Sequence, residues 1–254
     1  MNELAFARIS PRDAIDTKRS GDLHVDVWAC TLRGHADEIE AWHDDLSIEE
    51  RERAARFVRP HDRDRHVIAH GILRHVLARY RGVAPRELRF AHASHGKPAL
   101  VSGGSGPRIG FNLSHAGDAA LIAIAENVEV GVDLERERDN LDVAGIAGRF
   151  FHGRERVAIL EAANPARAFF RHWVAKEAVL KAHGSGFALA LDAFAIDFEG
   201  EDAASVVAPS LPDLERSHWR IHMLRVPRGW QAAVCVPQGF SIRVRTPAVG
   251  APAF

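Results

Sequence analysis

Two carboxylates close the polar face of a strictly alternating segment, VEVGVDLE (residues 128–135). The valines and Leu134 fall on one side and Asp133 and Glu135 on the other, which is the period of a half-buried strand. Two anions about 7 Å apart on one strand face repel each other unless a positive group lies between them. The pair could bind a divalent cation, since hard oxygen ligands on a rigid strand suit Mg²⁺. It could also be a solvated edge whose acids pair with a nearby arginine, and two acids alone leave both interpretations open.

A third acid comes from a distant segment, PARAFFRHWVAKEAVLKAHG (165–184). Trp173, Glu177 and Lys181 recur at i, i+4 and i+8, so they lie along one side of the expected helix. Glu177 and Lys181 could form an ordinary surface ion pair. Trp173, one turn away, indicates instead that this side is not fully solvated, and a partly buried acid and ammonium need a partner. Convergence of Glu177 with the strand carboxylates would favour the metal interpretation.

Two further polar motifs lie between these acids and the start of the chain. GFNLSHAG (110–117) holds Asn112, Ser114 and His115, which could donate hydrogen bonds to phosphate oxygens or bond their own backbone in a turn. SHGKPAL (94–100) contains a glycine that lets the backbone bend and a proline that stiffens it. We therefore expect Lys97 to be held out as a point charge.

The elements that must position these residues can be predicted from periodicity and caps. The first half predicts a strand at 23–32, a short basic helix at 47–58 with a Ser47/Glu50 capping box, and a long helix at 63–81. Short strands are expected within 88–113, split by the turn-rich loop 101–108. Residues 120–135 predict two strands joined by a tight turn near Glu126 and Asn127.

The second half repeats this order of elements. A helical region at 142–163 precedes the helix at 165–184, with Pro165 near its first turn and Gly184 just past its end. Strands are expected at 193–198, 219–226, 230–236 and 241–244, with a hairpin turn at Arg228-Gly229 and a frayed tail. The pattern predicts an α+β fold. We place an N-terminal lobe at 1–127 and a C-terminal lobe at 128–254, with the carboxylate strand at the seam.

Composition restricts the class of protein. The chain has 254 residues and a formal net charge of −1, so no overall field favours nucleic acid or an anionic membrane. No apolar run is long enough to span a membrane, and the N-terminal residues lack the apolar core of a secretion signal. Cys30 and Cys235 are far apart in apolar runs, which suits a reducing compartment. We expect a cytoplasmic protein.

The motifs are more informative together, in their order along the chain, than singly. The chain presents a basic helix pair, then G-K-P, F-N-L-S-H, G-V-D-L-E, and W-x-x-K-E-x-x-x-K followed by G-S-G-F. From about Ser47 to Phe198 it resembles a 4′-phosphopantetheinyl transferase of the larger, surfactin-synthetase-activating (Sfp) type. Enzymes of this family move the phosphopantetheine arm of coenzyme A onto a serine of a carrier-protein domain and leave adenosine 3′,5′-bisphosphate. The pairing of G-V-D-x-E with W-x-x-K-E-x-x-x-K is the diagnostic part.

The resemblance implies a role for each motif. Asp133, Glu135 and Glu177 would hold Mg²⁺, with Mn²⁺ as an alternative, and Glu177 would also be the general base. Lys181 and His115 would complete the catalytic set at the phosphates. The coenzyme A contacts would come from Arg53, Arg65, Gly96, Lys97, Pro98, Ser114, His115 and Lys181. The chain departs from the pattern at Glu50, where a relative carries lysine, and at His66, which replaces a small hydroxyl residue, so the 3′-phosphate contacts stay open.

The resemblance also implies two similar α+β lobes related by a pseudo-twofold axis, an active site at the seam, and a monomer. The partner would be an acidic acyl, peptidyl or polyketide carrier domain. A basic surface to meet it could come from Arg149, Arg154, Arg156, Arg167 and Arg171 beside Phe150 and Phe151, or these arginines could form a solvated helix face. The alternatives are another Mg²⁺-dependent phosphoryl-processing enzyme and a non-catalytic α+β interaction domain.

Overall fold

The computed structural model describes residues 3–11, 13, 17, 23–92, 96–101, 106–208, 211, 214 and 218–245. Residues 94–95, the centre of the turn-rich loop (102–105) and the predicted tail (246–254) lie outside these ranges. Within them, no helix combines the length and the apolar character that crossing a bilayer requires.

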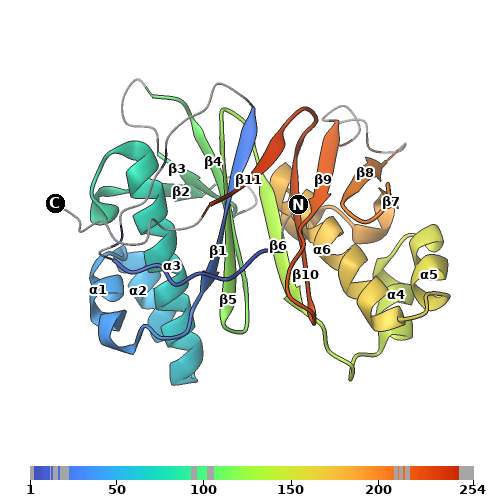
Figure 1. Ribbon diagram of the computed structural model, residues 1–254, viewed down its shortest axis with the longest axis horizontal. Helices are drawn as coiled ribbons and strands as arrows, with labels where there is room; N and C mark the ends of the chain where they lie inside the picture. Colours follow the sequence, from blue (N-terminus) through green and yellow to red (C-terminus); the bar gives the residue numbers. More distant parts are fainter. Residues whose placement is uncertain are drawn as a thin grey trace.

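Two sheets lie between two groups of helices (Figure 1). The first sheet has the order β11 (Ser241–Arg245), β1 (His24–Thr31), β5 (Ala119–Glu126) and β4 (Ile109–Ala116). The second has the order β6 (Gly131–Arg136), β10 (Trp230–Pro237), β9 (Trp219–Met223), β8 (Ala203–Val207) and β7 (Ala195–Phe198), and β2 (Phe90–His92) pairs with β3 (Pro98–Leu100) in a separate ladder. The α-helices are α1 (Ile39–Asp44), α2 (Ile48–Ala55), α3 (Pro60–Arg81), α4 (Val143–Phe150), α5 (Gly153–Leu160) and α6 (Pro165–His183). Short 3₁₀ turns are η1 (Ala36–Glu38), η2 (Pro85–Glu87), η3 (Gly186–Ala188) and η4 (Leu191–Ala193).

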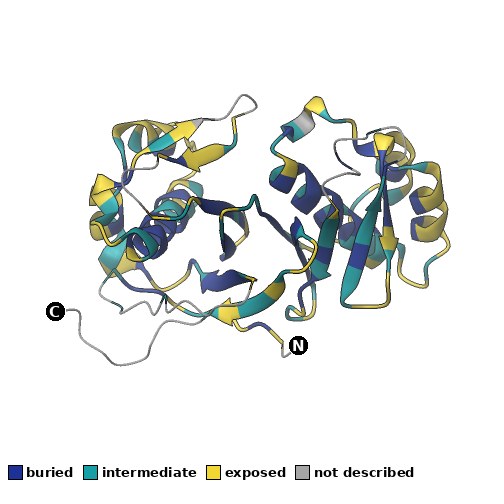
Figure 2. Cartoon of the chain, turned by 90° about the horizontal axis from the view of Figure 1, so that it is seen from above, coloured by how far each residue is buried: buried dark blue, intermediate teal, exposed yellow. Residues whose placement is uncertain are grey.

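The alternation of apolar residues along the strands explains the layers. On β1, Val25 and Val27 enter a core shared by the two sheets, while Trp28 enters the core beneath α1–α3. The second sheet adds Val132 and Val234 to the shared core and turns its other face to α6. Figure 2 shows these buried faces turned inward and exposed residues along the outer helices. The predicted α+β fold with two lobes, each a long helix on a sheet, is confirmed.

Local signals placed the start of α2 and both ends of α6, whereas α2 ends three residues before the predicted 58, α3 begins three residues before the predicted 63, and the helical region at 142–163 is two helices. Ser47 and Glu50 form the predicted capping box, with Ser47 N donating to Glu50 Oε2 at 2.8 Å and Glu50 N donating to Ser47 Oγ at 3.2 Å. Helix α6 begins at Pro165 under an Asn164 cap and ends at Gly184, whose φ of 78° suits glycine. The Arg228-Gly229 turn joins the antiparallel strands β9 and β10, as expected.

The two strands predicted on either side of Glu126 and Asn127 are present, but the turn between them does not form a hairpin. Strand β5 pairs with β1 and β4, whereas β6 pairs with β10 in the other sheet. Asn127, with a φ of 61°, does turn the chain, but residues 128–130 then carry it across to the second sheet. A period-2 pattern predicts which face of a strand is buried, but it does not predict which neighbouring strand that strand pairs with.

The lobe boundary at residues 127 and 128 stays a prediction. Each sheet is built from strands on one side of this boundary, with one exception. Strand β11 lies in the second half of the sequence but pairs in parallel with β1, with His24 opposite Ser241. Strand β8 was absent from the sequence prediction.

Candidate active site

The two sheets meet at one edge through side chains. The amide oxygen of Asn112 accepts from the backbone N–H of Val132 at 2.9 Å, and Ser114 Oγ accepts from that of Leu134 at 3.2 Å. Strands β4 and β6 thus lie side by side although they belong to different sheets. From the sequence we expected Asn112 to bond phosphate oxygens or its own turn, and did not foresee that its amide oxygen joins the two sheets.

Helix α6 approaches the same edge because of a glycine. A Cβ on Gly131 would lie 2.0 Å from the carbonyl oxygen of Ala178 and 2.4 Å from the amide nitrogen of Ala182, so any side chain there would push the helix away. The glycine of G-V-D-L-E therefore allows the strand acids and the helix residues of W-x-x-K-E-x-x-x-K to share one site.

Asp133 is 4% exposed, so the interpretation of this acid as a solvated edge is wrong. Its Oδ1 accepts from Lys181 Nζ at 2.6 Å and from Ser114 Oγ at 2.9 Å. Its Oδ2 is buried and has no hydrogen-bond partner among the described residues. One oxygen is thus fixed by the protein and the other is left for a further ligand.

Burial and the nearby Asp133 carboxylate raise the pKa values of the other two acids. Burial raises the pKa of Glu177 to about 7, helped by the charges of Asp133 and Glu135 and opposed by Lys181. Burial and Asp133 likewise raise the pKa of Glu135, and Arg138 lies 3.8 Å from that carboxylate. Glu177 Oε1 is also buried without a partner in the part of the chain that the structure describes. The structure therefore brings together the three acids that the sequence singled out.

The acids do not form a finished coordination shell. Within the described ranges, no three His, Cys, Asp or Glu side chains already have an arrangement that would hold a metal ion. The donor set nevertheless fits a divalent cation, because two buried carboxylate oxygens lack partners among the described residues, and burial together with the charge of Asp133 raises the pKa values of Glu135 and Glu177.

A cavity of about 230 Å³ opens beside these acids. It is lined by the Gly96-Lys97-Pro98 loop, Asn112, Glu177, Leu180, Lys181, Gly184 and Gly186. The loop and the helix motif, about eighty residues apart in sequence, therefore face one space.

Lys97 is not the free point charge that the sequence predicted. Its ammonium donates to Glu129 Oε2 at 2.7 Å, to the carbonyl of Val130 at 3.1 Å and to that of Ala182 at 3.4 Å. The side chain is 11% exposed. Lys97 connects the loop to the residues before β6 and to the end of α6, so its ammonium is already engaged by groups of the protein.

The remaining predicted nucleotide contacts lie on neighbouring elements. The pKa of His115, at the end of β4, is lowered first by desolvation and then by His70, Lys181 and other cations. Arg65 Nε donates to Asp118 at 2.7 Å, so its guanidinium is engaged. Arg53 lines a separate cavity of about 630 Å³ on α2, beside Arg56. The structure does not place Arg53 or Arg65 in the lining of the cavity beside Glu177.

Sequence reasoning also missed the role of Lys176, one residue before Glu177. Its side chain is fully buried, and Nζ donates to Glu155 Oε2 at 2.9 Å and to the carbonyls of Leu191 and Phe194 at 2.7 and 2.5 Å. No clear signal marked the pair, since Glu155 stands between Arg154 and Arg156 and Lys176 is followed by Glu177. Periodicity alone could not pair two segments 21 positions apart.

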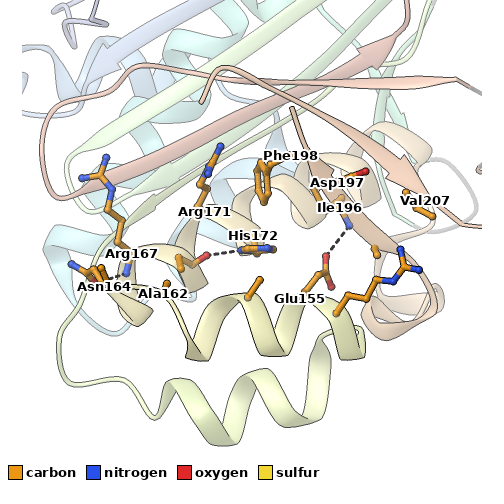
Figure 3. A pocket seen from close by; sticks show the side chains of 15 residues that line it. Glu155, Ala162, Asn164, Arg167, Arg171, His172, Ile196, Asp197, Phe198 and Val207 are labelled. Carbon is orange, nitrogen blue, oxygen red and sulfur yellow. Dashed lines mark hydrogen bonds between the residues drawn. The ribbon is translucent and has the colours of Figure 1, made fainter. Parts of the chain in front are cut away.

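The five arginines predicted for a carrier surface do not act as one group. Arg154, Arg167 and Arg171 line a cavity of about 660 Å³ between α5, α6 and β7 (Figure 3). Arg149 and Arg156 are exposed and are not among its lining residues within the described chain.

Comparisons with known proteins identify the family of the chain. A family model described as the 4′-phosphopantetheinyl transferase superfamily matches residues 129–235, and one described as 4′-phosphopantetheinyl transferase, N-terminal, matches residues 33–127. The 4′-phosphopantetheinyl transferase HetI of Nostoc sp. is 37% identical over 174 residues, which cover 68% of this chain and 73% of that protein. The 4′-phosphopantetheinyl transferase Sfp of Bacillus subtilis is 29% identical over 202 residues, covering 78% and 85%. The chain belongs to the 4′-phosphopantetheinyl transferase superfamily.

Proposed function

We propose that this enzyme transfers the 4′-phosphopantetheine of coenzyme A to a carrier-domain serine at the cavity beside Glu177, with a divalent cation held by Asp133, Glu135 and Glu177. Members of the family use coenzyme A as substrate and act on carrier-protein domains. The observation that carries the proposed site is the pair of buried carboxylate oxygens, Asp133 Oδ2 and Glu177 Oε1, that lack a partner among the described residues.

The cation we favour is Mg²⁺, with Mn²⁺ as the alternative, since both prefer oxygen ligands. When bound, it would neutralise charge on the pyrophosphate of coenzyme A. The support is the donor set itself, three carboxylates of which two have raised pKa values.

Glu177 is the proposed general base. The carrier serine oxygen attacks the phosphorus that bears the pantetheine arm, and the bond from that phosphorus to the oxygen of adenosine 3′,5′-bisphosphate breaks. The serine proton passes to the Glu177 carboxylate, directly or through a water molecule. A pKa of about 7 suits a group that must be ionised to accept this proton near neutral pH.

Lys181 is proposed to stabilise the charge that develops on the phosphate oxygens. Its ammonium, which bonds Asp133 at 2.6 Å and Ser114 Oγ at 3.1 Å, is already held at the edge of the cavity. A fixed cation in a partly dry site stabilises developing charge more than a mobile one in water. Ser114 and His115 would act with it, and the Gly96-Lys97-Pro98 loop would contact the adenine end through its backbone shape, since the Lys97 ammonium is engaged.

The carrier is proposed to be an acyl, peptidyl or polyketide carrier domain, served by a monomer. Arg53 and Arg65 remain candidates for the nucleotide. For Arg65 to serve, its guanidinium must exchange Asp118 for a phosphate, because Nε donates to that carboxylate at 2.7 Å.

The test is a mass measurement on several apo carrier domains incubated with coenzyme A and Mg²⁺. We expect each true substrate to gain one phosphopantetheine, and a carrier with alanine in place of its serine to gain none. The matched enzyme variants are Asp133→Asn, which keeps an oxygen for Lys181 and Ser114 but loses the charge, and Asp139→Asn on the exposed turn after β6.

Asp133→Asn should abolish the mass shift with an unchanged circular dichroism spectrum, and Asp139→Asn should keep it. If Asp133→Asn transfers at the wild-type rate, the proposed metal site is wrong. A wild-type enzyme that leaves every carrier unmodified would instead favour a different phosphoryl chemistry or a binding role.

A further inference from the structure

The cavity of about 660 Å³ between α5, α6 and β7 lies apart from the proposed active site. Its α6 residues include Arg167, Ala168 and Arg171, on one face of the helix. Glu177 follows Ala168 by nine residues, about two and a half turns, so it points away from Ala168, and the two cavities share none of their described lining residues. Whatever occupies this cavity is therefore not the reacting serine or the phosphates.

The rim of the cavity is positive. The guanidinium groups of Arg154 and Arg167 are exposed and form no ion pair with any residue in the described ranges. Arg171 is fixed, since its guanidinium lies 4.0 Å from the Phe198 ring and donates to the carbonyl of Gly200 at 2.5 Å. Figure 3 shows Arg167 and Arg171 beside the cavity, and Arg154 also belongs to its lining.

The acids of the lining do little to offset this charge. Glu155 is 2% exposed and is engaged by Lys176 and by the amide N–H of Ile196 at 2.8 Å. Asp197 is exposed and is the other carboxylate in the described lining. The cavity thus carries three arginines against one unengaged acid.

The interior of the cavity is apolar and uncharged. Its lining includes alanines of α5 and α6, Phe198 and Val207. His172 lies in its centre with Nδ1 bonded to the carbonyl of Ala168 at 2.8 Å, and burial lowers its pKa to about 4, so the ring is neutral near pH 7. The arginines around the opening would attract an acidic segment, and the small apolar residues inside the cavity would accept a short apolar side chain of that segment.

We infer that this cavity is a docking groove for an acidic surface segment of the carrier protein, remote from its modified serine. The inference rests on the proposed function for the identity of the partner. Arg167 and Glu177 are ten residues apart, about 15 Å along the helix axis. A domain of 100 residues has a radius of gyration of about 13 Å, so one carrier can touch the groove and still present its serine at the other end of α6.

The experiment compares charge-reversal variants by steady-state kinetics with an apo acyl carrier domain and by calorimetric titration of that carrier into the enzyme without coenzyme A. In the double variant Arg154→Glu/Arg167→Glu we expect the carrier KM and Kd to rise roughly tenfold, because rim charges govern encounter and affinity for an oppositely charged partner. The kcat and the Kd for coenzyme A should not change. Asp197→Asn, which removes the opposing charge, should lower the carrier KM.

The control is Arg156→Glu, a reversal on the same helix but outside the cavity, for which we expect a carrier KM within about twofold of wild type. An equal rise for Arg156→Glu would mean that a diffuse basic field, and no groove, selects the carrier. An unchanged carrier Kd in the double variant would overturn the inference while leaving transfer, and so the proposed function, intact. If the wild type transfers nothing, the proposed function fails, and the titration still decides whether the groove binds the acidic carrier.

Discussion

The site residues are arranged for a ligand rather than for the stability of the empty protein. Glu177 lies beside Asp133 and Glu135, and its Oε1 has no partner among the described residues. A carboxylate in such surroundings is more costly to ionise in the folded chain than in the unfolded one. The raised pKa of Glu177 therefore has a consequence for stability that can be measured without any substrate.

The folded protein should lose stability as the pH rises through the range in which Glu177 ionises. Between the unfolded value of 4.5 and the folded value of about 7, the folded state binds more protons than the unfolded state, so the free energy of unfolding falls with increasing pH. The full shift corresponds to at most about 3 kcal/mol. Glu177→Gln should remove this decline, as measured by urea unfolding at pH 5 and pH 8 without divalent cations.

The control is Glu161→Gln, which changes an exposed acid at the end of α5 and should leave the decline in place. The same Glu177→Gln variant should lose a factor of about 10²–10⁴ in kcat if Glu177 is the base. A pH profile of stability identical to wild type would show that Glu177 is not strained in the resting site, whatever its effect on turnover.

The identities of the site residues could be predicted from the sequence, but their environments could not. Asp133, Glu135 and Glu177 were recognised by type and spacing, and the structure gathers them. Lys97 was expected in solvent and is turned inward, because the acceptors it meets just before β6 and on α6 are more than 30 positions away in the chain. Spacing identifies which side chains share a face, and only the packed fold decides what that face meets.

At the scale of elements, the catalytic helix is held by a buried ion pair. Lys176 binds Glu155 on α5, while Glu155 also accepts from the amide N–H of Ile196 on β7 and from that of His152 at 3.0 Å. Burial lowers the pKa of Lys176 and raises that of Glu155, although each group opposes the shift in its partner. The pair fixes α5, α6 and β7 together one residue before Glu177.

Removing only one partner of this pair should lower the free energy of unfolding more than removing both charges. Lys176→Met leaves Glu155 ionised and buried without its cation, which costs about 3–5 kcal/mol in comparable pairs. Lys176→Met/Glu155→Gln keeps hydrogen bonding to the Ile196 amide and should recover part of that loss. A double-mutant cycle on the free energy of urea unfolding gives the coupling, and strictly additive losses would contradict a coupled pair.

Element ends and types were predictable because their causes are local. The Ser47 capping box, the Pro165 start and the Gly184 end each depend on a few adjacent residues. The pairing of strands was not predictable in the same way. The hairpin expected between β5 and β6 failed because residues 128–130 cross between sheets, and the join of β4 to β6 is made by the side chains of Asn112 and Ser114.

For the whole molecule, the end of the described chain closes the first sheet. Strand β11 returns from the second half to pair with β1, and it brings Arg243 and Arg245 to Asp26, which is 2% exposed. Arg243 Nε lies 2.5 Å and Arg245 Nε 2.9 Å from Asp26 Oδ1, and Tyr80 donates to Oδ2 at 2.5 Å. Burial alone would raise the pKa of Asp26, but these donors outweigh it and hold the pKa below 3.8. No local pattern could predict a contact 217 positions long.

The pairing of β11 with β1 should make the stability of the first sheet depend on residues 241–245, which follow the last strand of the second sheet. A chain ending at Phe240 loses both arginines and the strand that covers β1, and Asp26 keeps only Tyr80 among the donors described above, so we expect a loss of about 3–5 kcal/mol or more in urea unfolding. A chain ending at Arg245 keeps β11 and should stay close to the full chain. Asp26→Asn should destabilise the full chain, where it removes an ion pair, and should stabilise the chain ending at Phe240, where it removes an unpaired charge. The same sign in both backgrounds would mean that the arginines of β11 do not hold the sheet through Asp26.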